Sequence, residues 1–571
     1  MTDSAAELTA KSPEVCFFAE NRWRQGLFLT TLVLCLNLVG NGKVGLWDRD
    51  EPRYAGAVRE MRAAGEWIVP RFNDEPRYHK PILIYWLMGI GTALGGDNPF
   101  AARLVSSLAG VATVLVVWLL ARRLIGANWG FLAALMYATA PIVVAEAKLS
   151  TTDATLSFFL VTAQACIWGL SRRASKPLAA LFWVAISLAT LTKGPVGILL
   201  IAAAGLASWA FGGPVLGLRR LGWKWGVPLF LALTLPWYLA VGLRTNWDFF
   251  RFAWGDQVVK RVSVKMEEHG GFPGYYPVFT LLTFYPWSAL VPAALLAAWS
   301  RRKAAPELGF LMGWAIGPLV VLELFKTKMI HYYLPALPAL AILTAWFLAQ
   351  VSTGDALTIR RWRLGGLAIS LLGGVGLTMA IGLLASLALL PAEMRWSISL
   401  MVLALVVGTF YALLKFHQGA TVSASKTLVA TWSMVMVLMG GWVVPSAEPF
   451  RLSRVVGERL GELAAEHDAK PVLVTYQEPG IIYALKRSAP TLRNWNAVSQ
   501  YLQSNRALIA PMFPDQVASI SNDRRFVVEV VDRIEGFNLN KGQSHALSFV
   551  RIRNRPALVA RKGSNKEPLI Q

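Results

Sequence analysis

Long apolar runs separated by short polar segments dominate the chain from its first residues to about position 445. Runs of some 20 apolar residues are long enough to cross a bilayer as helices, and Pro and Gly blur several of their ends. The pattern predicts a polytopic α-helical membrane protein with thirteen spans, near residues 25–43, 100–121, 128–146, 154–171, 177–192, 196–213, 225–243, 275–300, 308–325, 332–350, 364–390, 396–414 and 425–445.

One apolar run, Pro81–Gly95, is too short to cross and is interpreted as a juxtamembrane helix that lies in the interface. Charge supports this choice. Without that run as a span, the short basic clusters all fall on the same side as the N-terminus. Because Lys and Arg are enriched in cytoplasmic loops, this places the N-terminus in the cytoplasm. These clusters are Arg122-Arg123, Arg172-Arg173, Arg219-Arg220-Lys224, Arg301-Arg302-Lys303, Arg360-Arg361-Arg363 and Lys415.

The opposite, outer side receives the long segments 44–99 and 246–273 and everything after Pro445. Beyond Pro445 the composition changes. Arg451–His467 has the pattern of an amphipathic helix, and Pro471–Tyr476, Ala507–Met512 and Phe526–Val531 that of strands. Two domains are therefore expected. Residues 1–445 form a membrane domain that includes the loop 44–99, and residues 446–571 form a small outer α/β domain.

Composition narrows the class of protein. Of the 571 residues, 55% are hydrophobic and only 16% are charged, which excludes an ordinary soluble enzyme. The net charge of +22 does not require nucleic acid, since most of the excess lies on the predicted cytoplasmic loops. Cys16, Cys35 and Cys166 are too scattered for a disulfide framework. The N-terminus lacks a basic region before its first apolar run and a cleavage site after it, so that run is interpreted as a retained span.

Residues that suggest chemistry gather on the outer side. The first outer loop carries Asp50, Arg53 and Tyr54 near its start and Lys80 near its end. Packed acids and bases can hold a sugar hydroxyl, an amine or a phosphate, and a solvated loop with local ion pairs is the simpler alternative. Asp153 begins the fourth span, either as a helix N-cap or as an acid of the site.

Two further outer turns are rich in cations and phenols. Lys193 breaks the positive-inside trend and requires an anionic partner, unless it only snorkels to the interface. Tyr332 lies in Lys326–Pro335, which suits either phosphate binding or a headgroup anchor.

The loop Trp254–Gly274 is either a gating lid or an inert connector. His79, Glu268 and His269 are weak candidates for a metal, because their spacing is not that of a metal site.

Direct use of a nucleotide is not indicated, since the chain has no P-loop, no G-x-G-x-x-G and no G-x-S-x-G motif. A lipid-linked sugar phosphate would suit a site at the membrane. No cofactor is required on these grounds, although a divalent metal remains open.

The first outer loop resembles that of the GT-C glycosyltransferases that use polyprenyl-phosphate sugars. It is most similar to the family that transfers 4-amino-4-deoxy-L-arabinose to lipid A in Gram-negative bacteria. One departure is His79, where that family would have Glu. The segments that carry the resemblance are Asp50–Ala55, Arg59–Met61, Gly65–Pro70, Lys80-Pro81, Tyr85-Trp86 and Tyr332 with Leu334-Pro335.

The resemblance implies an inverting transfer from undecaprenyl phosphate to a lipid A phosphate at the periplasmic side of the inner membrane, a modification linked to polymyxin resistance. It further implies that Asp50 and Asp153 are the catalytic acids. The donor phosphate and substrate would be held by Arg53, Tyr54, Lys80, Lys193 and Tyr332. A phosphate acceptor is already anionic and needs no strong base, so Asp50 is hypothesised to position the acceptor or to counter positive charge. The alternatives are a sibling enzyme with another sugar or a protein acceptor, and a non-enzymatic transporter or lipid-binding scaffold.

Overall fold

The computed structural model describes residues 21–48, 50–253, 255, 270–353, 373, 376, 392–448, 451–538 and 543–555. The chain folds as two compact units, Met1–Glu448 and Pro449–Gln571. The first is built from helices, and the second combines helices with a sheet.

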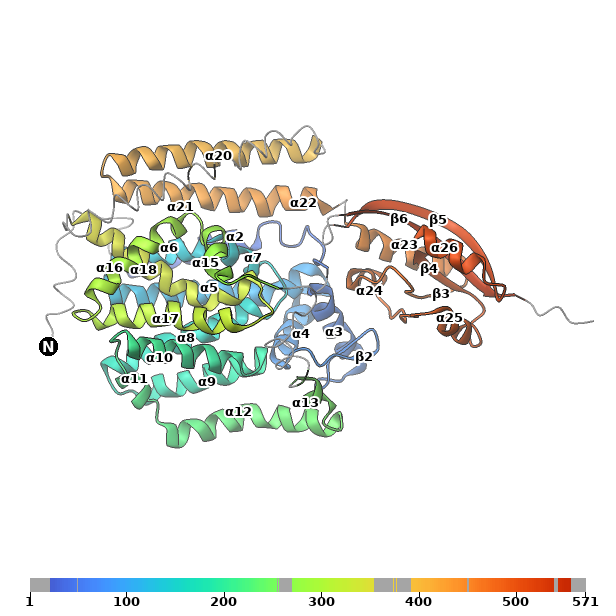
Figure 1. Cartoon of the computed structure of the whole chain (residues 1–571), viewed down its shortest axis with the longest axis horizontal. Helices are drawn as coiled ribbons and strands as arrows, with labels where there is room; N and C mark the ends of the chain where they lie inside the picture. The colour runs from blue at the N-terminus through green and yellow to red at the C-terminus, as the bar shows by residue number, and fades with distance from the viewer. Residues whose placement is uncertain are drawn as a thin grey trace, which may run out of the picture. The chain divides into compact units, whose positions relative to one another are not determined.

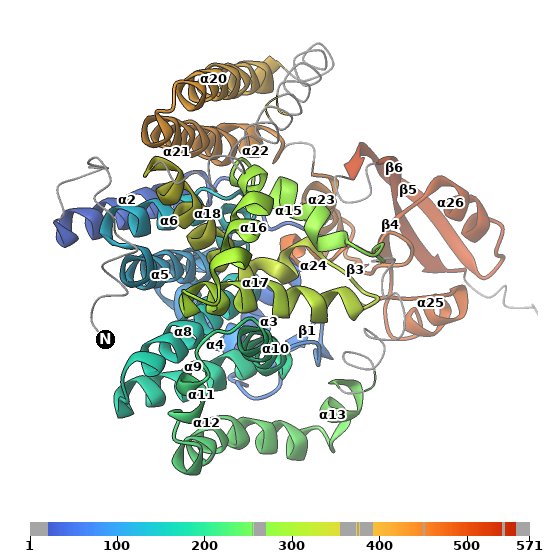
Figure 2. The same ribbon diagram turned by 60° about the vertical axis from the view of Figure 1, so that its left-hand side comes forward.

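Long helices form the body of the first unit (Figure 1). Among the described residues, seven helices are long and apolar enough to cross a membrane, or eight if the bent pair α6–α7 is one span. Figures 1 and 2 both show α12 and the pair α20–α21 at opposite sides of this unit. The longer helices are α2 (Arg22–Leu38), α5 (Pro99–Ile125), α8 (Asp153–Arg172), α9 (Lys176–Lys193), α10 (Val196–Ala210), α12 (Trp223–Arg244), α17 (Pro306–Leu324), α18 (Leu337–Ser352), α20 (Ala392–His417) and α21 (Thr421–Leu438).

Besides the span at 425–445, where α21 is continued by a π-helix and a short α-helix, three of the predicted spans that the structure describes are not single α-helices. The span at 128–146 is α6 (Ala127–Ala138) and α7 (Pro141–Ala147), which meet at a bend of 64°. The span at 275–300 breaks into α15 (Tyr275–Thr283), the 3₁₀ turn η2 (Trp287–Leu290) and α16 (Val291–Arg301). The span at 332–350 starts with the 3₁₀ segment η3 (Ile330–Ala336). Pro141, Pro286 and Pro335 lie at these breaks, where a proline lacks the N–H that a continuing helix needs.

The thirteen-span count stays a prediction. The predicted span 364–390 lies outside the described residues apart from Gly373 and Gly376. Short elements complete the helical unit, and they are α11 (Leu216–Arg219), α13 (Asp248–Phe252), the π-helix η5 (Met439–Val443) and α22 (Val444–Ser446).

The first outer loop is ordered by two helices and a hairpin. Helix α3 (Glu51–Ala64) has Pro52 in its first turn and ends at Gly65, whose φ of 65° suits glycine at a helix C-terminus. Strands β1 (Arg71–Phe72) and β2 (Glu75–Pro76) pair antiparallel. The short apolar run is helix α4 (Leu83–Gly95), whose 13 residues are too few to span a membrane. In Figure 1, α3 and α4 lie together at one end of the long helices.

Lys148, the residue that follows α7, contacts the end of the first long helix, α2. The Lys148 ammonium donates to the backbone oxygens of Val39 (2.6 Å) and Asn37 (3.3 Å). Gly40 and Gly440 allow the chain to cross here, since a Cβ on Gly40 would lie 1.9 Å from the Gly440 oxygen. Burial, and next the positive charge of Arg103, lower the pKa of Lys148 from 10.5 to about 8.

In its described residues, 451–538 and 543–555, the second unit has a four-stranded sheet in the order β3-β4-β6-β5 and four helices. Helix α23 (Leu452–Glu466) and strand β4 (Leu508–Met512) agree with the sequence-based expectations, whereas strand β5 (Phe526–Asn538) begins as expected and runs well past the expected end at Val531. Strand β3 (Lys470–Pro471) is much shorter than expected. Strand β6 (Gln543–Asn554) was missed, although it pairs with both β4 and β5. The remaining helices are α24 (Pro479–Leu485), α25 (Trp495–Tyr501) and α26 (Pro514–Ser521).

We predict that the stability of the protein carries a pH dependence from Lys148. Between its folded pKa of about 8 and its ordinary value of 10.5, the unfolded chain binds the proton more tightly than the folded one. The contribution of this group to stability therefore rises with pH in that window and is lowest below pH 8. Melting temperatures of the wild type and Lys148→Met, measured from about pH 7 to 10, check this. An equal pH slope in both proteins would contradict it.

Candidate functional site

A buried ion pair organises the start of the first outer loop. The Glu51 carboxylate on α3 accepts hydrogen bonds from the Arg103 guanidinium on α5 at 2.6 and 2.8 Å. The side chains of Glu51 and Arg103 are only 1% and 2% exposed, respectively. The same guanidinium donates to the backbone oxygens of Asn41 (2.8 Å), Val44 (2.8 Å) and Gly45 (2.7 Å). The pair therefore ties the segment after α2 to both helices.

Two backbone groups complete this network. The Glu51 carboxylate also accepts from the backbone N–H of Trp47 (2.7 Å) and of Ser150 (2.6 Å). Burial alone would raise the pKa of Glu51, but the charge and hydrogen bonds of Arg103 and these N–H groups hold it below its ordinary value. Glu51 follows Asp50 directly, and Ser150 lies three residues before Asp153. The network thus fixes the backbone beside both predicted catalytic acids.

Asp50 is an exposed carboxylate at the N-terminus of α3. It forms no side-chain hydrogen bond with the helix, whereas its backbone oxygen accepts from the N–H of Arg53 and Tyr54. Arg53 is half-buried in the first turn. Because the side chain of Asp50 does not cap the helix, its carboxylate is available to a substrate.

Tyr54, which the sequence analysis placed among the substrate-binding residues, is buried and packs against other residues of the loop and of α4. It is 3% exposed, its ring lies 5.6 Å from that of Tyr85 on α4, and the Arg77 guanidinium lies 5.1 Å from its ring centre. Arg77 also donates to the Tyr85 hydroxyl at 3.1 Å. Burial, then the charge of Asp50, raise the pKa of Tyr54 well above its ordinary value, so its hydroxyl stays protonated. Arg77 and Tyr85 join α4 to the loop, and any contact of Tyr54 with a donor stays a prediction.

Asp153 and Lys193 form an ion pair between α8 and α9. Their Oδ1 and Nζ atoms are 2.5 Å apart, and each side chain is 10% exposed. Thr152, not Asp153, is the N-cap residue of α8, so the carboxylate of Asp153 faces its lysine and does not cap the helix. The Lys193 ammonium lies 4.6 Å from the centre of the Tyr332 ring. The structure thus brings three predicted site residues together and gives Lys193 its anionic partner.

Two residues that the sequence interpretation did not select complete this cluster. Glu146 on α7 and His331 on η3 face each other, with Oε1 and Nδ1 3.5 Å apart. The other ring nitrogen of His331 lies 3.8 Å from Oδ2 of Asp153. Glu146 is the one acid within the apolar run 128–146, and a carboxylate in such a run is itself a sign of function.

Lys80 lies close enough for its charge to act on both Asp153 and His331. Its neighbour His79 is exposed and packs against Phe252, with ring centres 4.9 Å apart. The other two metal candidates, Glu268 and His269, lie outside the described residues. Within the part of the chain that the structure describes, no three His, Cys, Asp or Glu side chains gather as metal ligands.

The turn after α17 is braced by a second ion pair. Lys328 is 5% exposed, pairs with Glu323 and donates to the Phe272 oxygen at 3.1 Å. Glu323 in turn accepts from the backbone N–H of Tyr276 (2.8 Å) and Gly274 (3.2 Å). The structure therefore gives Lys328 an anchoring contact with the segment before α15.

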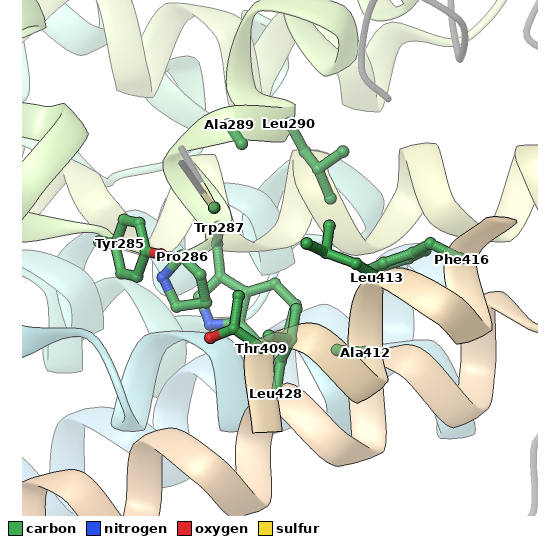
Figure 3. Close-up of a pocket in the computed structure, with 11 residues that line it drawn as sticks. Tyr285, Pro286, Trp287, Ala289, Leu290, Thr409, Ala412, Leu413, Phe416 and Leu428 are labelled. Carbon is green, nitrogen blue, oxygen red and sulfur yellow. The ribbon is translucent and has the colours of Figure 1, made fainter. Parts of the chain in front are cut away.

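The charged cluster is distinct from a pocket lined by apolar side chains (Figure 3). In that view, Leu290 of η2 and Leu413 of α20 point toward one another. Other lining residues are Tyr285, Pro286, Trp287, Ala289, Gly373, Thr409, Ala412, Phe416 and Leu428. None of the acids or bases described above lines it. The buried carboxylates and fixed cations of the cluster around Asp153 are of the kind that can stabilise a phosphate and a developing positive charge.

Known proteins resemble this chain across most of its length. The family model described as dolichyl-phosphate-mannose-protein mannosyltransferase matches residues 79–239. The undecaprenyl phosphate-alpha-4-amino-4-deoxy-L-arabinose arabinosyl transferase of Aeromonas salmonicida (strain A449) is 31% identical over 419 residues, which are 70% of this chain and 74% of that protein. The protein of the same name from Pseudomonas aeruginosa (strain UCBPP-PA14) is 30% identical over 441 residues, 73% and 76% of the two chains.

Solved structures share the fold. The crystal structure of ArnT from Cupriavidus metallidurans bound to undecaprenyl phosphate superposes with a TM-score of 0.73 at 21% identity, covering 93% of this chain and 98% of that one. The Archaeoglobus fulgidus oligosaccharyltransferase in complex with Zn and sulfate gives a TM-score of 0.50 at 12% identity, covering 91% and 72%. With its apolar helices, this likeness identifies the chain as a multi-pass membrane protein.

We predict that Arg103→Met destabilises the protein by about 3–5 kcal/mol, because it leaves the buried Glu51 carboxylate without its cation. Denaturant unfolding in detergent measures this loss. The matched control is Arg59→Met, which breaks the partly exposed pair with Asp97 and should cost about 1 kcal/mol or less. Equal losses in the two variants would refute the central place given to the Glu51–Arg103 pair.

Proposed function

Because the chain belongs to the family of undecaprenyl phosphate-alpha-4-amino-4-deoxy-L-arabinose arabinosyl transferases, we propose that it transfers this amino sugar from undecaprenyl phosphate to a phosphate of lipid A. The observation that carries the proposal is the identity with these relatives over 70% of the chain, a stretch longer than any single motif. The cluster of acids and bases around Asp153 supplies chemistry that suits such a transfer. The multi-pass architecture suits a donor and an acceptor that are both lipids.

The reaction is a single displacement. An oxygen of the acceptor phosphate attacks the anomeric carbon, a new C–O bond forms, and the bond to the donor phosphate breaks with inversion. The electron pair leaves on undecaprenyl phosphate. Since the acceptor oxygen is already anionic, no side chain has to remove a proton from it. The protein must therefore bind two anions close together and stabilise positive charge on the sugar between them.

The side chains divide these tasks by charge. Lys80 and Arg53 are the cations proposed to hold the donor phosphate, Arg through a planar fork and Lys as a point charge. Lys193 is paired with Asp153, but an ammonium has three N–H donors, so a phosphate contact remains compatible with that pair. Exposed Asp50 is proposed to counter the amino group or the oxocarbenium-like sugar carbon.

The site is proposed to face the periplasm at the bacterial inner membrane. The distribution of Lys and Arg supports this orientation, since it places the loop 44–99 and the turns around Asp153, Lys193 and Tyr332 on the side opposite the basic loops. The second unit would lie on the same outer side. Resistance to cationic peptides such as polymyxin would follow, because the added amino sugar offsets negative charge on lipid A.

A second candidate is a related enzyme that moves another polyprenyl-phosphate sugar or uses a protein acceptor. The match of residues 79–239 to the protein mannosyltransferase family favours it.

Mass spectrometry of lipid A separates the two candidates. We predict that cells expressing the protein gain a lipid A species heavier by one 4-amino-4-deoxyarabinose residue, and that this species is absent without the gene and strongly reduced with Asp50→Asn. A modified protein with unchanged lipid A would support the second candidate. Near-full transfer by Asp50→Asn would rule out an ionic role for that carboxylate.

We predict that Lys80→Ala lowers kcat/KM for the donor by about ten- to a hundredfold, since a hydrogen bond between charged groups contributes roughly 1.5–3 kcal/mol. Transfer kinetics with purified protein and varied donor concentration measure the change. Lys43→Ala, at an exposed position before the same loop, serves as the control and should stay within about twofold of the wild type. Unchanged donor kinetics in Lys80→Ala would remove it from the phosphate site.

A further inference from the structure

The contacts around His331 connect two carboxylates that come from different helices. Its Nδ1 faces Glu146 Oε1 at 3.5 Å and its Nε2 faces Asp153 Oδ2 at 3.8 Å. The side chains of His331, Glu146 and Asp153 are 17%, 6% and 10% exposed, respectively. Both distances are longer than ordinary hydrogen bonds, as is common for catalytic groups before substrate is bound. The imidazole thus lies between the two acids with one nitrogen toward each.

The two carboxylates differ in how they are neutralised. Asp153 has the Lys193 ammonium at 2.5 Å and accepts from the Thr152 hydroxyl at 3.2 Å. Glu146 is more deeply buried, and its carboxylate accepts a hydrogen bond from the neutral hydroxyl of Thr151 at 3.1 Å. A buried carboxylate with so little support is costly in its charged form. It therefore needs either a proton of its own or a protonated His331.

Other charged groups around η3 do not meet this need. Lys328 is engaged with Glu323, Lys193 with Asp153, and Lys80 and Asp50 act on His331 from a distance with opposite signs. The charged or titratable side chains on η3 and on the elements packed against it, other than His331, are Glu146 on α7, Asp153, Cys166 and Arg172 on α8, Tyr275 and Tyr276 on α15, Glu307 and Glu323 on α17, and Tyr332 and Tyr333 on η3 itself. Lys193 of α9 pairs with Asp153, and Lys328 precedes η3.

We propose that Glu146 and His331 are positioning residues that together hold one proton, with the Nε2–H of His331 directed at Asp153. The proton is on Glu146 or on the imidazole, and in both arrangements the pair is neutral overall and the Nε2–H donor is present. This donor fixes the second oxygen of Asp153, whose first oxygen is held by Lys193. The role in catalysis rests on the proposed function.

Loss of this proton has a direct consequence for the site. The Glu146–His331 pair then carries a negative charge, so this pair and Asp153 are two anions that compete for the Lys193 ammonium. The field that should favour a departing donor phosphate is weakened, while the cations proposed to bind the donor most directly, Lys80 and Arg53, are unchanged. The proposal therefore assigns the effect to kcat more than to KM.

The first test compares pH profiles of transfer by purified wild type, Glu146→Gln, Glu146→Ala, His331→Ala and His331→Gln. The amide introduced by Glu146→Gln can donate to Nδ1, which keeps the Nε2–H donor without a titrating carboxylate. Glu146→Gln should thus retain most of the neutral-pH activity and keep it at alkaline pH where the wild type declines. His331→Ala should lower kcat about tenfold or more with KM within about threefold, and His331→Gln should recover part of the loss by donating to Asp153.

His417→Gln, at an exposed histidine near the end of α20, is the matched control and should leave the pH profile and kcat unchanged. If Glu146→Gln is as impaired as Glu146→Ala with the wild-type pH profile, the shared proton is refuted. If His331→Ala raises KM and leaves kcat intact, the positioning role is refuted.

A second measurement needs no substrate and so separates this inference from the proposed function. Because deprotonation adds a second buried negative charge beside Asp153 only in the folded protein, the wild type should lose stability relative to Glu146→Gln as the pH rises from about 6 to 9. Melting temperatures of the purified proteins record this difference. Parallel curves would overturn the shared proton, whereas absent sugar transfer by a wild type with diverging curves would overturn only the proposed function.

Discussion

The buried pair of Glu51 and Arg103 is the constraint on which the candidate site depends. A carboxylate and a guanidinium removed from water are tolerated only when all of their hydrogen-bonding capacity is used. The backbone groups that satisfy them belong to the loop after the first long helix and to the turn before α8, and the pair itself joins α3 to α5. Asp50 and Asp153 come from segments about 100 residues apart, and the same carboxylate fixes the backbone beside both.

Around this scaffold, the site is arranged in two layers of charge. The outer layer is the exposed carboxylate of Asp50 with half-buried Arg53 and Lys80, which suits contact with anionic and cationic parts of a substrate. The inner layer is the buried group of Glu146, Asp153, Lys193 and His331, in which each charge depends on a neighbour. The electrostatic field that acts on a substrate in the outer layer is therefore set largely by the charges of the inner layer.

Local patterns in the sequence indicated much of the fold and the outer layer of the site. Hydrophobic periodicity and length identified the long helices and the short helix α4, and the resemblance of the first loop to the GT-C family selected Asp50 and Lys80. What the sequence could not indicate depended on contacts between distant segments. Arg103 is conspicuous as a charge inside the predicted span 100–121, but only the fold shows that its partner is Glu51, and His331 acquires its meaning only from Glu146 and Asp153. Strand β6 carries an alternating stretch of its own, Val550-Arg551-Ile552-Arg553, which the sequence interpretation did not use, and its pairing with β4 and β5 shows that it is a strand.

The hydrogen bonds of Arg103 also bear on how the chain can diverge among relatives. In three of them the acceptor is a backbone oxygen, which every amino acid supplies. These hydrogen bonds therefore do not depend on which residues occupy positions 44 and 45. The path of this loop can be inherited while its residues drift. Only the exchange between positions 51 and 103 is chemically specific, and substitutions there are expected to covary across the family while the residues at positions 44 and 45 can change without loss of these contacts.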